Sequence, residues 1–181
     1  MSSPTLARPA GLASLGSGSW LAEPYRVRSP HRVHIGSGVS IGERSVLSVV
    51  DELNGVRYGA TLRVGDGCVI GTDFYVHCAG EITIGAGVAI GARVFVCDSS
   101  RDLTTRSESL IDLGVGKIEP VRIGDGATVG VGAIVMPGVT VGERARVSAG
   151  ATVTRDVPPG AVASGNPARI VRAEAAEGDS G

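Results

Sequence analysis

Aromatic residues are scarce in this chain, which has only 2 Phe, 3 Tyr and 1 Trp among 181 residues. Aromatic side chains usually supply much of the buried area of a compact domain. Here 43% of the residues are hydrophobic and 28 are Gly, so the interior must be thin, repetitive and lined by aliphatic side chains. At this length we expect one such domain.

The sequence also lacks an excess of charge and any long apolar run. The 17 Lys and Arg against 18 Asp and Glu give a net charge of −1, without the basic surplus of a protein that binds a phosphate backbone. No segment approaches the roughly 18 apolar residues of a membrane span, and residues 1–20 lack the features of a signal peptide. We therefore expect a soluble, cytoplasmic protein with neither nucleic-acid nor membrane partners.

Paired cysteines are missing as well. The three cysteines, Cys68, Cys78 and Cys97, are odd in number and form no CxxC motif, which argues against a disulfide framework and against a structural zinc site. We predict reduced, buried thiols.

A six-residue period dominates the second half of the chain. An aliphatic residue recurs at every sixth position, and a second small or aliphatic residue follows each one four positions later. The first set is Ile123, Val129, Val135, Val141, Val147 and Val153; the second is Ala127, Ala133, Val139, Ala145, Ala151 and Val157. This period matches neither a helix nor an alternating strand. It predicts an all-β fold, a parallel β-helix in which coils stack about 4.8 Å apart.

The same pattern occurs earlier in the chain, with interruptions. Its members there are Ile35, Ile41, Leu47, Leu53, Val64, Ile70, Val76, Ile84, Ile90 and Val96. The longest interruption predicts an inserted loop over residues 97–120, whose many charged residues are typical of a binding loop.

The two ends differ from the repeat. Residues 1–30 are rich in Ser, Gly and Pro and show no period, so we expect a partly disordered N-terminal arm. The β-helix domain should then cover residues 31–172. Within it, the segment 158–172 begins with a Pro-Pro-Gly break and is expected to run back over the last coil. Residues 173–181 are predicted to be a disordered tail.

The hexads continue into the segments VTRDVPP at 153–159 and SGNPAR at 164–169. With these motifs, residues 33–172 resemble the hexapeptide-repeat acyltransferases, in particular the branch of the maltose and galactoside O-acetyltransferases. The resemblance implies a left-handed β-helix, a homotrimer with active sites between neighbouring β-helices, and acyl-CoA bound along the C-terminal coils. It also implies O- or N-acyl transfer, with acetyl-CoA or another acyl-CoA as co-substrate, to a sugar, an amino sugar or a similar small metabolite.

The resemblance places the contacts to CoA at six positions of the final coils. They are Val131, Ala149, Thr154, Arg155, Arg169 and Arg172. The small side chain of Ala149 would leave room for the pantetheine arm, and the three arginines would supply fixed positive charge for the phosphates. Without the resemblance, these arginines would be interpreted as a solvated surface.

The position of the family's catalytic His is occupied by Arg101. An arginine stays protonated and cannot act as the general base. Three alternatives remain open. His77 and Cys97 could lie side by side and act as a base or nucleophile pair; Asp98 or Asp102 could be the base, with Arg101 stabilising the oxyanion; or the chain has lost acyl transfer and serves as a binding or accessory protein or runs another reaction.

A metal site is the remaining candidate. His31 and His34 form an HxxH motif that His77 could complete, as in the related γ-class carbonic anhydrases. Those enzymes draw their ligands from middle coils and across the trimer interface, whereas this pair precedes the first clear hexad. We therefore expect no metal.

Overall fold

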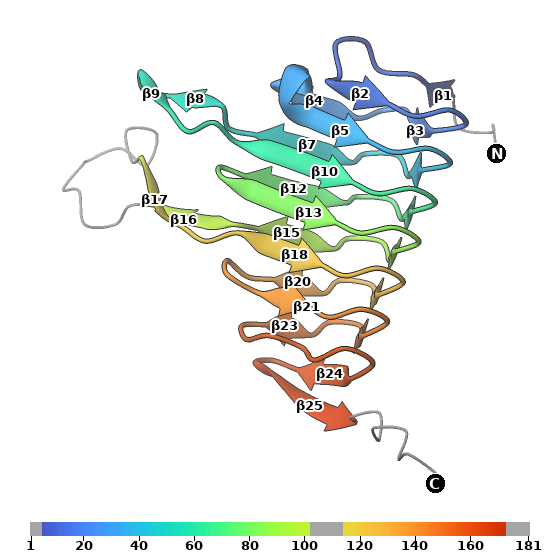
Figure 1. Cartoon of the computed structure of the whole chain (residues 1–181), viewed down its shortest axis with the longest axis vertical. Coiled ribbons are helices and arrows are strands. Elements are labelled where there is room, and N and C mark those ends of the chain that lie inside the picture. The colour runs from blue at the N-terminus through green and yellow to red at the C-terminus, as the bar shows by residue number, and fades with distance from the viewer. Residues whose placement is uncertain (1–4, 102–113, 173–181) are drawn as a thin grey trace, which may run out of the picture.

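The computed structural model describes residues 5–101 and 114–172. Three sheets form the three faces of a β-helix, and they are parallel except for the first and last strands of one sheet. The coils stack in one column, with the first and last described strands at opposite ends (Figure 1). Each complete coil contributes a strand to the first, the second and then the third face. In this part of the chain no helix is long and apolar enough to span a membrane.

The three faces have the following strands. The first contains β2 (Ser14–Leu15), β5 (Val33–Ile35), β10 (Thr61–Val64), β13 (Glu81–Ile84), β18 (Val121–Ile123) and β21 (Thr140–Val141). The second contains β1 (Leu6–Ala7), β3 (Trp20–Ala22), β6 (Ser40–Ile41), β11 (Val69–Ile70), β14 (Ala89–Ile90), β19 (Thr128–Val129), β22 (Arg146–Val147), β24 (Val162–Gly165) and β25 (Ala168–Arg172). The third contains β4 (Arg26–Arg28), β7 (Val46–Val49), β12 (Tyr75–Cys78), β15 (Phe95–Cys97), β20 (Ile134–Val135) and β23 (Thr152–Val153).

Two hairpins interrupt the coils at the same edge, where the third face passes into the first. β8 (Glu52–Leu53) pairs with β9 (Val56–Arg57), and β16 (Ser99–Arg101) pairs with β17 (Val115–Ile118), both antiparallel. They project from the same side of the β-helix (Figure 1). A 3-10 helix, η1 (Pro30–Arg32), lies at this edge in the first coil. Of the loop predicted over residues 97–120, the structure therefore describes both stems, and residues 102–113 lie outside the described part.

The core is a single layer of aliphatic side chains. The periodic residues point inward and are buried; Ile123, Val129 and Val135 are each at most 1% exposed. Within the described residues, Phe74 is the one aromatic side chain among the buried members of the core. The scarcity of aromatics follows from this geometry, because a coil of two-residue strands encloses room for only one layer of branched side chains.

The N-terminal boundary differs from the expectation. Residues 14–28, expected in an arm, form the first coil, in which β2, β3 and β4 pair in parallel with β5, β6 and β7. Leu15, Leu21 and Val27 pack into or against the core and are themselves six residues apart. That signal was missed because an eight-residue step separates Val27 from Ile35.

The C-terminal segment turns back on the last coil. β24 extends the second face, and β25 folds back to pair antiparallel with it. Residues 1–4 and the predicted tail 173–181 lie outside the described residues.

Candidate active site

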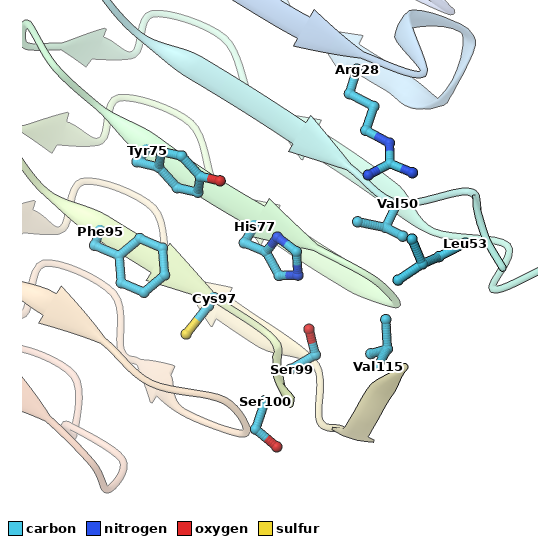
Figure 2. Close-up of a pocket in the computed structure, with 10 residues that line it drawn as sticks. All are labelled: Arg28, Val50, Leu53, Tyr75, His77, Phe95, Cys97, Ser99, Ser100 and Val115. Carbon is cyan, nitrogen blue, oxygen red and sulfur yellow. The ribbon is translucent and has the colours of Figure 1, made fainter. Parts of the chain in front are cut away.

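A hollow of about 530 Å³ opens on the third face, between the two hairpins. Its lining is mainly apolar, with one guanidinium, one imidazole, one thiol and three hydroxyls. The lining residues are Arg28, Val50, Leu53, Tyr75, His77, Phe95, Cys97, Ser99, Ser100 and Val115 (Figure 2). Concave, mostly apolar pockets with a few polar groups are typical of small-molecule sites. We call this hollow the third-face pocket.

Strand register builds the floor of the third-face pocket. Successive residues of a strand point to opposite sides, so Val76 and Val96 enter the core while their neighbours face outward. β12 and β15 pair with Tyr75 opposite Phe95 and His77 opposite Cys97. The two aromatic rings lie 5.5 Å apart between centroids at a tilt of 54°, and they form an apolar wall beside His77 (Figure 2).

The hairpins supply the rim. Leu53 comes from β8, and Val115 comes from β17 on the other side of the His77 coil (Figure 2). The Arg28 guanidinium donates from Nη2 to the carbonyl oxygen of Glu52 at 2.8 Å, which attaches the first hairpin to the third face. Leu53 was predicted as a core position of a hexad; this is wrong, because the hairpin carries it out of the coil to the rim.

His77 and Cys97 lie side by side in the register, as their spacing predicted, but the thiol is not activated. Its Sγ lies 3.9 Å from the carbonyl oxygen of Val135, and in Figure 2 it points away from the imidazole. Burial, together with the negative charge of Asp98, raises the pKa of the Cys97 thiol to about 11. The nucleophile in thiol chemistry is the thiolate, so this geometry does not suit Cys97 to nucleophilic attack.

Asp98 does not have the environment of a general base. Its side chain is fully buried, and its two carboxylate oxygens accept hydrogen bonds from the backbone N–H groups of Ala79 and Gly80, each at 2.8 Å. Both oxygens are therefore engaged by the turn that follows His77. Arg101 lies in β16 with its backbone opposite Val115, and its side chain lies outside the described part, as does Asp102.

Two of the predicted CoA positions, Val131 and Ala149, lie in successive coils at the corner between the second and third faces. Both are exposed, and the carbonyl oxygen of Val131 accepts a hydrogen bond from Gly150 N at 2.9 Å. Gly132 and Gly150 follow them with φ of +68° and +69°, and no atom lies within 4 Å of where their Cβ atoms would be. In the three preceding coils this corner position carries Arg44, Asp73 or Arg93. The last coils thus present bare backbone here.

The remaining four CoA positions lie elsewhere on the last coils. Thr154 and Arg155 follow β23 at the opposite edge of the third face, and Arg155 and Arg169 line a hollow of about 170 Å³. Arg172 lines a separate hollow of about 160 Å³ with Arg146. The six positions therefore lie at two corners of the last coils and on β25.

The two histidines of the HxxH motif contact side chains other than His77. His31 Nε2 lies 3.3 Å from Asp51 Oδ2, and His34 Nδ1 lies 3.4 Å from the hydroxyl of Ser14. Among the described residues, no three His, Cys, Asp or Glu side chains are grouped in a way that could hold a metal ion.

Sequence reasoning missed Arg28, Tyr75, Phe95 and Val115. A usable signal existed for the two aromatics, because in a chain with so few aromatic rings they occupy the same position, directly before a core valine, in consecutive coils. For Arg28 and Val115 we find no comparable signal.

Comparison of the sequence with known proteins identifies its family. A family model described as the hexapeptide repeat of succinyl-transferase matches residues 120–155. The nodulation protein L of Rhizobium meliloti (strain 1021) is 39% identical over 160 residues, which cover 86% of this chain and 85% of that protein. The chain belongs to the hexapeptide-repeat acyltransferases.

Solved structures agree with this membership in the acyltransferase family. The acetyltransferase VCA0836 of Vibrio cholerae O1 biovar eltor, in complex with acetyl coenzyme A, is 25% identical with a TM-score of 0.63, over 90% of this chain and 71% of that one. AntD, an N-acyltransferase from Bacillus cereus solved with dTDP and 3-hydroxybutyryl-CoA, shares the fold at 20% identity and a TM-score of 0.75, over 90% and 84%. The predicted left-handed parallel β-helix and the predicted acyltransferase class are both confirmed.

Proposed function

We propose that this acyltransferase transfers an acyl group, in the first instance acetyl, from CoA to a hydroxyl or amine of a sugar, an amino sugar or a similar small metabolite, and that the reaction takes place in the third-face pocket. The observation that supports this most directly is the position of His77 beside an apolar wall, between two hairpins, in a chain whose family performs acyl transfer. An imidazole is the side chain best suited to exchange protons at neutral pH.

The proposed roles follow from the chemistry of the lining. His77 takes the proton from the acceptor hydroxyl or amine as its oxygen or nitrogen attacks the thioester carbonyl carbon, and the C–S bond then breaks to release CoA. The rings of Tyr75 and Phe95 pack against the apolar face of the acceptor. Arg101 is assigned to stabilising the oxyanion or an anionic acceptor, because a guanidinium holds its charge but cannot accept a proton.

CoA is proposed to lie along the last coils. The bare corner beside Val131 and Ala149 leaves space for the pantetheine arm. Arg155 and Arg169 provide charge for the phosphates, and Thr154 and Arg172 provide further polar contacts. Neighbours of known structure bind 3-hydroxybutyryl-CoA and acetyl coenzyme A, which supports an acyl-CoA as co-substrate.

A homotrimer is proposed as the working assembly. The thin β-helix leaves large apolar side chains on its surface, including Val69 at 58% and Val131 at 44% exposure, and closed cyclic assembly would cover such surface. We also propose a cytoplasmic location, since acyl-CoA is available there.

The experiment is an acyl-transfer assay on the purified chain. Acetyl-CoA is supplied with a panel of sugars and amino sugars, free CoA thiol is measured with a thiol reagent, and the acetylated acceptor is identified by mass spectrometry. Thiol release that depends on one class of acceptor is expected. If calorimetry shows that CoA binds and yet no acceptor in the panel releases thiol, the binding or accessory role replaces acyl transfer.

A further inference from the structure

Asp98 is a fully buried carboxylate that takes no part in the proton transfer assigned to His77. It lies where β15 leaves the coil and enters the β16–β17 hairpin. Burying a charged group is costly unless hydrogen bonds compensate it, and here two backbone N–H groups do so, each at 2.8 Å. The position of this buried, hydrogen-bonded carboxylate at the edge of the proposed active site suggests a specific role.

The contacts of Asp98 join three segments of the third-face pocket. Its carboxylate holds the turn at Ala79 and Gly80, directly after β12, the strand that carries His77. Its backbone N–H donates to the carbonyl oxygen of His77 at 3.2 Å, and its own carbonyl oxygen accepts from Glu119 N at 2.7 Å. The end of the His77 strand and both roots of the hairpin that carries Ser99, Ser100 and Val115 therefore meet at one residue.

We propose that Asp98 is a positioning residue of the acyl-transfer site. It fixes His77 relative to the β16–β17 hairpin and touches neither the acceptor nor the transferred proton. This inference rests on the proposed function of the pocket, in which His77 must sit within hydrogen-bond reach of the attacking group. Small displacements of a catalytic group, on the order of 1 Å, cost about 100-fold in rate.

The side chain required at this position is specifically a carboxylate. Each of its oxygens faces an N–H donor, whereas an asparagine would place its own N–H₂ against one of them. The turn is also tightly packed, because a Cβ on Gly80 would lie 2.5 Å from Ile118 Cγ2 and 3.5 Å from Asp98 Oδ2. The turn after His77 is thus held between Asp98 and the far stem of the hairpin.

The chain offers a matched control in Asp125. Its Oδ1 accepts a hydrogen bond from Ala86 N at 2.8 Å, so it too caps the backbone of an adjacent coil. It does so at the corner between the first and second faces, away from the third-face pocket. Asp98→Asn and Asp125→Ala each remove one capping hydrogen bond, because an asparagine keeps only one acceptor oxygen and an alanine keeps none. Loss of His77 alignment should be specific to Asp98→Asn.

The test compares these two variants in the full chain. With acetyl-CoA and the best acceptor of the panel, Asp98→Asn is expected to lower kcat by about 10- to 100-fold while KM for acetyl-CoA changes by less than about twofold. Asp125→Ala is expected to keep kcat within about twofold. Equal kcat losses in the two variants would show that Asp98 has only a general structural role and would overturn the proposal.

Two further measurements keep the outcome decisive. If Asp98→Asn does not fold, Gly80→Ala disturbs the same turn from the other side; kcat should fall, and Ile118→Ala in the same chain should restore it. If Ile118→Ala does not restore kcat, the proposal is overturned. If the wild type transfers no acyl group, the proposed function fails separately, and the ring signals of His77 in NMR spectra, assigned with His77→Gln, still test Asp98. They should shift in Asp98→Asn and stay in place in Asp125→Ala, and unchanged signals in both would refute the positioning role.

Discussion

Cys97 and His77 are neighbours on the third face with different chemistry. Burial is the main reason that the pKa of the Cys97 thiol is raised to about 11, and the charge of Asp98 adds to it. At pH 7 to 9 the folded protein therefore keeps this thiol protonated. Burial also raises the pKa values of Cys68 and Cys78, as expected of thiols that pack as small apolar groups.

This difference predicts opposite results for two substitutions in the third-face pocket. His77→Gln removes the proposed base and should lower kcat by about 100- to 10,000-fold, the range for loss of general base catalysis. Cys97→Ser removes a protonated thiol and should lower kcat by less than about fivefold. Both are measured as kcat at saturating acetyl-CoA, with thermal unfolding as a control for folding. Similar losses in the two variants would restore the thiol-imidazole pair as the catalytic unit.

At the scale of the element, the stacking of the coils brings the backbones of adjacent coils into close contact at the corners. A Cβ on Gly85 would overlap the carboxylate of Asp125 and would lie 2.8 Å from the backbone nitrogen of that residue. The same arrangement recurs between Gly36 and Asp66. Glycine is needed at these corners because the next coil occupies the space of a side chain.

Gly85→Ala should therefore destabilise the fold. Either the coils separate locally or Asp125 gives up its bond to Ala86 N, and overpacking of this kind costs about 1–3 kcal/mol. The measurement is the free energy of unfolding from urea titration. Gly114→Ala is the matched control, because the nearest atom to its added Cβ would be the Tyr58 hydroxyl oxygen at 3.9 Å, and it should change stability by less than about 0.5 kcal/mol. Equal stability of the two variants would contradict this account of the corners.

The elements also show what the sequence can predict. The period of six marks residues that face the core, so it predicted buried positions between Ile35 and Val153 and the side-by-side position of His77 and Cys97. It was wrong at Leu53, because a hairpin residue can match the period by coincidence. Outward-facing Tyr75 and Phe95 could not be assigned to a pocket from the sequence, because their environment depends on hairpins that no period describes. Asp98 was expected as a possible base because the sequence shows that it is acidic. The sequence does not show that backbone N–H groups of the neighbouring coil occupy both carboxylate oxygens.

In the whole molecule, the proposed site extends well beyond the third-face pocket. Val131 and Ala149 lie at one edge of the third face, and Thr154 and Arg155 lie at the other. In a cyclic assembly, edges that are separate in one chain can be brought together across an interface. In the proposed trimer, the binding site for CoA would therefore be completed by a neighbouring chain. The proposed contacts to the CoA phosphates can be tested through the two arginines that line one hollow.

Arg155 and Arg169 line this hollow beside β25. If they hold the CoA phosphates, Arg155→Ala and Arg169→Ala should each raise KM for acetyl-CoA about tenfold, because a hydrogen bond to a charged group contributes on the order of 1.5 kcal/mol, and should leave kcat at saturation nearly unchanged. The wild-type KM should also rise with salt, and less steeply in the variants, because these contacts are exposed to solvent. Arg122→Ala is the control, since Arg122 is exposed on the first face near Glu81. A KM for acetyl-CoA that moves equally in all three variants, or in none, would place the phosphates elsewhere on the protein.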